Sequence, residues 1–193
     1  MESRFQILVP LGASFILVYF VRISFNKKAR VFVYTLLLVL FVCTNCLGYL
    51  QFQKDWFKQL SLMENFKESE IIKNNCSFLF DDKTTNLNVS NRTYMFFEYT
   101  GLMKLVFGNE RRFGTSYYQS DFIDEKHKVF IPYGAYSCRE YKIQGPQYKV
   151  VIDHGEYQLG NLRALKLILI EFINPAEFKK LIKNIIKLEY AKL

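Results

Sequence analysis

The stretch VRISFNKKARVFVY (residues 21–34) joins two long apolar runs through a short basic segment. The first run, residues 5–25, contains one charged residue, Arg22, and the second run, residues 31–50, contains none. An α-helix needs roughly 20 apolar residues to cross the hydrocarbon core of a bilayer. A soluble helix is rarely apolar on every face over such a length. The sequence therefore predicts that residues 1–50 form a hairpin of two transmembrane helices.

Basic residues around the link between the runs predict the orientation of this hairpin. The residues that set the topology are Arg22, Lys27, Lys28 and Arg30. Loops rich in Lys and Arg tend to stay in the cytoplasm, so we expect residues 26–30 to be cytoplasmic and residues 51–193 to be extracytoplasmic. A cleaved signal peptide is the alternative for the first run, but its basic cluster should precede the apolar core, and here the stronger cluster follows it.

The charge of the chain is divided evenly between the two predicted parts. The net charge of +8 consists of +4 in residues 1–50 and +4 in residues 51–193. In the second part 21 basic residues are mixed with 17 acidic ones, unlike the concentrated basic stripe of a nucleic-acid-binding protein. We therefore expect the lipid bilayer as a partner and no nucleic acid.

The four cysteines form two pairs. Cys43 and Cys46 lie within the second apolar run, where we interpret them as small packing residues. Cys76 and Cys138 lie in the part predicted to be outside, where oxidation is permitted. A disulfide between Cys76 and Cys138 is one hypothesis, and two free buried thiols are the alternative.

Residues 51–193 predict an α+β domain in which a short sheet is covered by helices. We expect a helix over 51–73, a strand over 76–82, and a helix over 92–107 with Asn91 as N-cap and Gly108 just past its end. Residues 108–147 are rich in Gly, Tyr and charge and predict irregular structure, with a short strand within 128–134.

The last part of the chain contains three further predicted elements. Residues 148–157 indicate a strand and turn, and the apolar run 161–173 indicates a buried strand, although periodicity alone does not distinguish it from an apolar helix. NPAEFKKLIKNIIKLEYAKL (174–193) has Asn174 as N-cap, Pro175 at the first position and Glu177 at the third. We expect a helix here, whose lysines face either water or anionic lipid headgroups.

Arginines and tyrosines accumulate between residues 111 and 141. Arginine grips phosphate or carboxylate groups through paired hydrogen bonds, and tyrosine offers a flat face and a hydroxyl for a sugar or a lipid headgroup. The candidate ligand-binding residues are Arg111, Arg112, Tyr117, Tyr118, Asp121, Tyr133, Tyr136, Arg139 and Tyr141. Ordinary loop packing is the alternative explanation for the same composition.

Other motifs in the chain are weaker evidence of a functional site. Asp153, His154 and Glu156 resemble a ligand cluster, but neighbouring residues at a strand end more often form a turn, so we expect no metal site and no cofactor. Asn75, Asn88 and Asn91 begin N-x-S/T sequons, which are glycan acceptors in a secretory-pathway protein and accidental in a bacterium. No nucleophile elbow, P-loop or dinucleotide fingerprint is found.

From the second apolar run through DWFKQLSLMENF (55–66) to RTYMFFEYTGLMKLVFG (92–108), the layout resembles the C-terminal end of polytopic GT-C glycosyltransferases. The resemblance implies hydrophobic spans before a small extracytoplasmic α/β domain and a lipid-linked sugar donor. Acidic catalytic residues of that family lie in an early outer loop, to which no segment of this chain corresponds. No catalytic residue is therefore carried over, and activity would depend on another chain or on a preceding portion.

These observations predict a multi-pass membrane protein with an extracytoplasmic domain that binds or scaffolds. Its expected context is a cell-envelope glycan machine, with other membrane subunits or a lipid-linked glycan as partners. The alternative is an enzyme, a C-terminal fragment of a GT-C-like glycosyltransferase that uses lipid-linked sugar. A sensor or stress-linked membrane protein is a third possibility that the sequence does not separate from the first.

Overall fold

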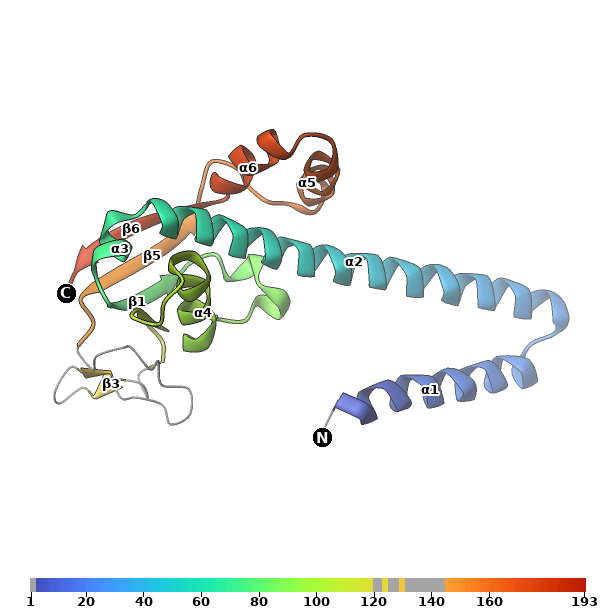
Figure 1. The fold of residues 1–193 in the computed structure, drawn as a ribbon. Coiled ribbons are helices and arrows are strands. Elements are labelled where there is room, and N and C mark those ends of the chain that lie inside the picture. Colours follow the sequence, from blue (N-terminus) through green and yellow to red (C-terminus); the bar gives the residue numbers. More distant parts are fainter. Residues whose placement is uncertain (1–2, 120–122, 125–128, 131–144) are drawn as a thin grey trace. The chain divides into compact units, whose positions relative to one another are not determined.

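The computed structural model describes residues 3–119, 123–124, 129–130 and 145–193, and it contains both helices and a four-stranded sheet, as an α+β fold predicts (Figure 1). The chain divides into two compact units, Met1–Gly48 and Tyr49–Leu193. We refer to them as the N-terminal unit and the C-terminal unit.

Two apolar helices make up the N-terminal unit. Helix α1 spans Ser3–Ser24, and α2 spans Lys27–Glu68, so that α2 begins in this unit and ends in the next. Asn26 lies just before α2 and accepts a hydrogen bond from the backbone N–H of Ala29 at 3.0 Å, as an N-cap does. The Tyr34 hydroxyl donates to the Val18 carbonyl at 3.2 Å, which joins the two helices.

Within the described residues, α2 is the one helix that is long and apolar enough to cross a membrane. The Gly12–Ser24 part of α1 is apolar but shorter. The structure therefore supports one candidate span. The predicted pair of spans stays a prediction.

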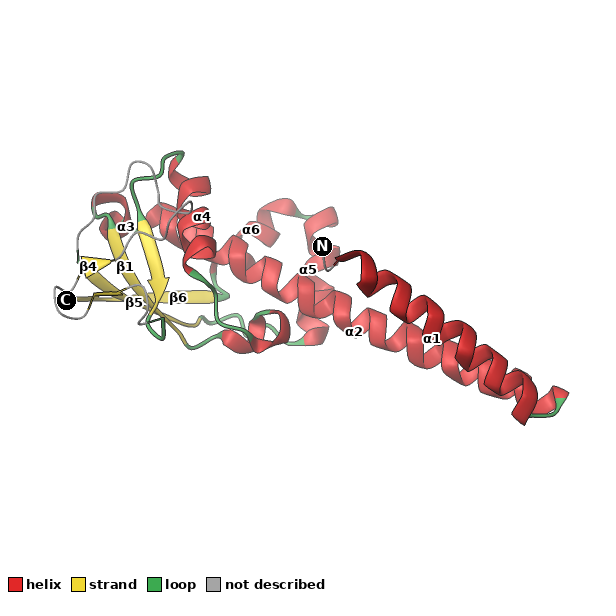
Figure 2. Cartoon of the chain, turned by 90° about the horizontal axis from the view of Figure 1, so that it is seen from below, coloured by secondary structure: helices red, strands yellow, loops and turns green. Residues whose placement is uncertain are grey.

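A mixed four-stranded sheet is the centre of the C-terminal unit, and its strands are drawn in yellow in Figure 2. The strand order is β2-β1-β5-β6, with bounds β1 Ser77–Asp82, β2 Phe113–Ser116, β5 Tyr148–His154 and β6 Ile186–Lys192. Both β2 and β5 run parallel to β1, and β6 runs antiparallel to β5. A second pair, β3 (Ile123–Asp124) and β4 (Val129–Phe130), is antiparallel.

The helices of this unit follow the strands in a simple order. Helix α3 (Glu70–Asn74) precedes β1, and α4 (Phe96–Phe107) provides the crossover that a parallel β1–β2 connection needs. Helices α5 (Asn161–Ile173) and α6 (Pro175–Lys183) lie between β5 and β6. Two 3₁₀ turns, η1 (Thr85–Leu87) and η2 (Val89–Asn91), fill the loop after β1.

One face of the sheet carries the apolar core. Phe80 of β1 stacks on Tyr99 of α4, with ring centroids 4.2 Å apart, and contacts Phe66 of α2 at 5.7 Å. Both helices therefore cover the same face of β1. On α2, Phe57 also meets Phe178 of α6 edge to face at 5.7 Å. The core thus depends on alternate residues of β1, because successive side chains of a strand point to opposite faces.

Several predicted elements are confirmed. The strand over 76–82 corresponds to β1, and α4 ends at Gly108, which has a left-handed φ of 69°. Asn174 caps α6 through a hydrogen bond from the Glu177 N–H at 3.2 Å, with Pro175 in the first turn. The helix predicted over 51–73 is present as the end of α2 and α3, interrupted at Ser69, whose side chain caps α3.

The predicted buried strand over 161–173 is wrong, because this segment is helix α5. Ala164 and Leu167, spaced three apart, are fully buried, whereas Leu162, Phe172 and Ile173 are each 82% exposed. A continuous apolar run fits either a strand or a helix. Here the burial of one stripe at helical spacing resolves that ambiguity.

The predicted helix over 174–193 is correct only to Lys183, since residues 186–192 form strand β6. This segment also alternates, with Ile186, Leu188 and Tyr190 less exposed than the residues between them. Pairing along seven residues of β5 gives the backbone groups on one side of β6 their hydrogen-bond partners. This long-range pairing overrides the helical pattern.

Two predictions about the central segment also need correction. Helix α4 begins at Phe96 with Met95 as N-cap, so Asn91 is not its cap; Asn91 lies in η2 with a φ of 53°. Residues 108–147 are not irregular throughout, because β2 pairs with β1. The predicted strand within 128–134 is present over Val129–Phe130, and residues 128 and 131–134 lie outside the described part of the chain.

A tight turn at Gly155 provides a test of the β5–β6 arrangement. Its N–H donates to the Ile185 carbonyl at 2.8 Å, and a Cβ atom here would overlap the carbonyl oxygen of Asn184. We expect Gly155→Ala to destabilise the C-terminal unit by about 1–3 kcal/mol, the usual cost of overpacking. Thermal unfolding of the full chain in detergent, followed by circular dichroism, measures this as a lower Tm.

Gly101 provides the matched control, because a Cβ atom there would meet nothing within 4 Å and alanine favours the helix that contains it. Gly101→Ala should leave Tm unchanged or raise it. Equal Tm values for Gly155→Ala and the unsubstituted chain would contradict the described turn.

Candidate functional site

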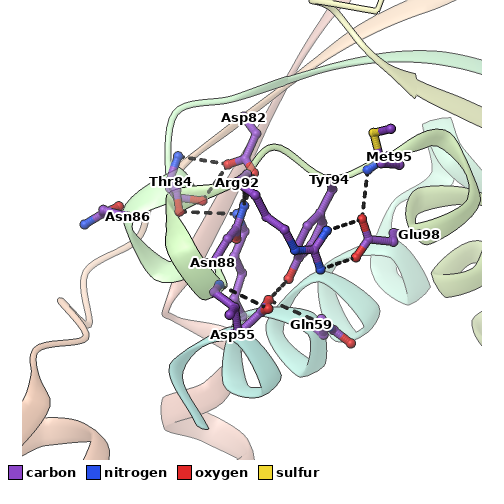
Figure 3. A network of polar contacts seen from close by, with 12 residues as sticks. Asp55, Gln59, Asp82, Thr84, Asn86, Asn88, Arg92, Tyr94, Met95 and Glu98 are labelled. Carbon is purple, nitrogen blue, oxygen red and sulfur yellow. Dashed lines mark hydrogen bonds and ion pairs between the residues drawn. The ribbon is translucent and has the colours of Figure 1, made fainter. Parts of the chain in front are cut away.

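The C-terminal unit contains two regions in which polar side chains gather: a buried network at the end of β1 and an exposed tyrosine surface at the end of β2. The buried network involves α2, β1, the loop that contains η1 and η2, and the start of α4, and its contacts are drawn in Figure 3. It consists of Asp55, Lys58, Gln59, Asp82, Thr84, Asn88, Arg92, Tyr94 and Glu98.

Lys58 is the centre of the buried network. Its side chain is fully buried, and its Nζ lies 2.5 Å from Oδ2 of Asp82, 2.6 Å from Oδ1 of Asn88 and 3.3 Å from the Thr84 carbonyl. A charged ammonium group has three N–H donors, and these three acceptors match them. Burial lowers the pKa of Lys58, and the Asp82 carboxylate partly offsets this effect.

Asp82 is equally well satisfied. Besides Lys58, its carboxylate accepts hydrogen bonds from the Thr84 backbone N–H at 2.9 Å and the Thr84 hydroxyl at 2.7 Å, and from the Asn88 amide at 3.4 Å. Asn88 also donates to the Arg92 carbonyl at 2.6 Å. Since the Asn88 side chain is fully buried and bonded, the sequon that begins there is not accessible in the folded chain.

A second carboxylate on α2 extends the network toward α4. Asp55 accepts hydrogen bonds from the Tyr94 hydroxyl and, at 3.3 Å, from the Val89 N–H. Burial, together with the bond to Asp55, raises the pKa of Tyr94, so the phenol remains protonated and donates. Next to it, Arg92 forms a bidentate pair with Glu98, both bonds being 2.6 Å.

These contacts indicate that the network has a structural role. Lys58, Thr84 and Asn88 have no exposed surface, and the ammonium and carboxylate groups at the centre are bonded to one another. A substrate would have to displace these internal bonds and enter a closed interior. The network therefore holds α2 against the end of β1 and is not the candidate binding site.

The exposed tyrosine surface lies at the carboxyl end of β2 and is formed by Tyr117, Tyr118, Lys149 and Asp81. Tyr117 is 49% exposed and Tyr118 is 71% exposed, and their rings meet edge to face at 5.7 Å. The backbone N–H of Tyr117 donates to the Phe80 carbonyl at 2.6 Å, which fixes this segment to β1.

Lys149 of β5 connects the tyrosines to the charge of Asp81. Its Nζ lies 4.4 Å from the centroid of the Tyr117 ring and 2.8 Å from Oδ2 of Asp81. The hydrogen bond to Asp81 raises the pKa of Lys149, which keeps the ammonium group charged. Two exposed tyrosine rings and a partly buried ion pair therefore lie together, in a combination suited to a hydroxyl-rich ligand.

The structure separates the predicted Arg/Tyr cluster into parts. Arg112 precedes β2 and Tyr117 follows it, so they lie at opposite ends of that strand. Arg112 is buried and donates to the carbonyls of Ile72 at 2.7 Å and Lys73 at 2.5 Å, which caps the end of α3. Its guanidinium also lies 3.9 Å from the Phe107 ring centroid. These contacts account for Arg112 structurally.

The other predicted site residues are placed as follows. Arg111 is exposed, with its backbone N–H bonded to Asn109 at 3.4 Å. The candidate binding residues outside the described part of the chain are Asp121, Tyr133, Tyr136, Arg139 and Tyr141. Cys76 is half-buried and Cys138 lies outside the described residues, so the bridge between them stays a prediction.

A cavity of about 540 Å³ lies where β5 ends and is lined by His154, Gly155, Glu156 and Lys187, among others. His154 and Glu156 flank the tight turn at Gly155, as expected from their positions at a strand end. In the described part of the chain, no group of three or more His, Cys, Asp or Glu side chains could hold a metal ion.

No family model matches this chain, and neither a curated protein nor a solved structure matches it.

The buried Lys58–Asp82 pair can be tested by its effect on the stability of the C-terminal unit. We expect Lys58→Met to destabilise the C-terminal unit by about 3–5 kcal/mol, since it leaves the Asp82 carboxylate buried without its counter-ion. The free energy of unfolding of the full chain in detergent, from urea titration followed by circular dichroism, measures the effect.

Lys73→Met is the matched control. Lys73 forms an exposed pair with Glu70 at 3.2 Å, and such surface pairs contribute roughly 0–1 kcal/mol. The double variant Lys58→Met/Asp82→Leu should regain much of the stability that Lys58→Met loses, because both charges are then removed. Equal losses for Lys58→Met and Lys73→Met would contradict a buried pair.

Proposed function

We propose that this chain is a membrane-anchored protein whose C-terminal unit is an extracytoplasmic domain that binds or scaffolds at the bilayer surface. One observation supports this most strongly: α2 contains the candidate span and also the first core residues of the C-terminal unit. Leu50, the last residue of the apolar run, and Phe57, two helical turns later, are already buried in the core. With so little chain between span and core, the domain works next to the membrane.

Aromatic residues near the start of the C-terminal unit support the same placement. Phe52 is 62% exposed and Trp56 is 47% exposed, one helical turn apart on α2. Aromatic side chains, Trp in particular, favour the headgroup region at either end of a transmembrane helix. Their exposure just after the apolar run fits a position at the membrane interface.

The proposed topology has two spans, α1 and the first part of α2, with the link in the cytoplasm. Arg22, Lys27 and Lys28 are exposed at the link, and Arg30 is half-buried and donates to the Phe25 carbonyl at 2.6 Å. The three exposed charges are free to face the cytoplasm, as the positive-inside rule expects. The hairpin then presents both termini on the outer side.

Cysteine labelling tests this topology. In a chain without native cysteines, we expect a membrane-impermeant maleimide to label Ser3→Cys and Tyr118→Cys in intact cells, and Lys28→Cys only after permeabilisation. Immunoblotting of the labelled protein measures each position separately.

Labelling of Tyr118→Cys only after permeabilisation would overturn the extracytoplasmic domain. If Ser3→Cys alone required permeabilisation, the chain would cross the membrane once, with α1 on the inner side. Retention of the chain in the pellet after carbonate extraction is the control for membrane anchoring in every variant.

A more specific proposal is that the exposed tyrosine surface binds a glycan. The observation that favours it is the group formed by Tyr117, Tyr118, Lys149 and Asp81, in which two exposed aromatic rings lie beside a partly buried ion pair. The resemblance of the layout to GT-C glycosyltransferases makes a lipid-linked sugar the candidate ligand. Binding of this ligand would suit both a scaffold and an enzyme fragment that acts with another chain.

Binding of a polyprenyl-pyrophosphate-linked N-acetylhexosamine to the full chain in mixed micelles tests this proposal. Tyr118→Ala and Tyr117→Ala should each raise Kd by roughly tenfold, the equivalent of about 1.4 kcal/mol of lost contact. Phe97→Ala is the control, since Phe97 is 53% exposed on α4. An unchanged Kd in both tyrosine variants would contradict the site, and sugar transfer by the chain would favour the enzyme class.

A further inference from the structure

Helix α5 has an unusual distribution of apolar side chains. Ala164 and Leu167 are fully buried and join the helix to the core. A second apolar group faces outward and consists of Leu162 (82% exposed), Leu165 (45%), Leu169 (62%), Phe172 (82%) and Ile173 (82%). At 100° per residue these five lie within an arc of roughly 100°, which we call the α5 outer face.

The core of the C-terminal unit does not account for the α5 outer face. Ala164 and Leu167 already pack α5 on the core of the unit. A helix that needs only to pack on a core carries polar residues on its opposite side. Five large apolar side chains on one exposed arc mark an interaction surface. The remaining question is which partner covers them.

Charges around the α5 outer face identify the kind of partner. Lys166 borders the arc and is exposed, and Lys180 is exposed on the neighbouring helix α6. The segment 161–183 contains five Lys and Arg against two Glu, and of these Lys179 and Lys183 are paired with Glu64 and Glu68 of α2. Apolar side chains bordered by basic ones are the composition of helices that lie in the interface of an anionic bilayer.

Within the C-terminal unit, α5 lies across the direction of α2. Figure 1 shows α5 nearly end-on, whereas α2 runs across the view, so the axes of α5 and the α2 segment of this unit cross. In addition, both views place α5 beside the end of the C-terminal unit at which α2 enters it (Figures 1 and 2).

We propose that the α5 outer face inserts into the interface of an anionic bilayer and seats the C-terminal unit on the membrane. This inference rests on the proposed membrane anchoring and adds a second attachment to it. The apolar side chains enter the boundary between headgroups and acyl chains, and Lys166 and Lys180 remain at the level of the anionic headgroups.

Depth-dependent fluorescence quenching tests the proposal on the full chain. The sequence contains one tryptophan, so Trp56→Phe provides a background without tryptophan fluorescence. Single reporters are then introduced as Phe172→Trp on the α5 outer face, Leu105→Trp on α4, where the native leucine is 75% exposed, and Leu38→Trp in the candidate span. Each variant is reconstituted in phosphatidylcholine–phosphatidylglycerol vesicles with and without brominated acyl chains.

We expect brominated lipid to remove most of the emission of Phe172→Trp and of Leu38→Trp, and to leave Leu105→Trp unchanged. Emission of Phe172→Trp should also shift to shorter wavelengths. Replacing phosphatidylglycerol with phosphatidylcholine should reduce quenching at residue 172 and not at residue 38. Equal quenching in both compositions would overturn the role assigned to the lysines.

Two outcomes would overturn the proposal itself. Phe172→Trp that is unquenched while Leu38→Trp is quenched would refute insertion of α5 and leave the anchor intact. If the emission of Phe172→Trp is unquenched but its wavelength changes with the protein-to-lipid ratio, the α5 outer face would instead contact a second copy of the chain. Loss of quenching at Leu38→Trp would instead refute the proposed anchoring, so the two failures are distinguished.

Discussion

The buried ion pair between Lys58 and Asp82 is the constraint on which the C-terminal unit depends. The partners are 24 residues apart and come from α2 and the end of β1, and neither side chain is exposed. Such a pair contributes little net stability compared with apolar residues, but separating it is costly. A rotation or slip of α2 would leave both charges buried and unpaired. The pair therefore selects one position of α2 on the sheet.

The rest of the core agrees with that position. With Lys58 opposite Asp82, Phe66 reaches Phe80 on the core face of β1, and Tyr94 donates to Asp55 one turn earlier on α2. The loop between β1 and α4 closes over the pair through Thr84 and Asn88. Polar and apolar contacts thus require the same arrangement, which is the consistency expected of a sequence with one folded state.

Short sequence motifs predicted the structure correctly where only neighbouring residues determine it. Asn174 with Glu177, and Gly108 after an apolar helix, each depend on a few neighbouring residues, and the structure confirms them. These motifs failed where contacts with a distant segment determine the secondary structure or the burial of a residue. Residues 186–192 carry both a helical and an alternating pattern, and only the edge of β5 selects the strand. Likewise, nothing near Lys58 shows that this lysine is buried, because its partners lie 24 to 30 residues away.

The predicted Arg/Tyr cluster illustrates the same limit, since composition does not separate a structural arginine from a ligand-binding one. Arg112 is used by the end of α3, while Tyr117 and Tyr118 remain exposed beyond β2. The proposed membrane anchoring would also explain the exposed apolar side chains of α5. If the core begins directly after the membrane span, one side of the unit must face lipid headgroups. Apolar residues such as those of α5 are then stable there, whereas in a protein surrounded by water they would favour aggregation.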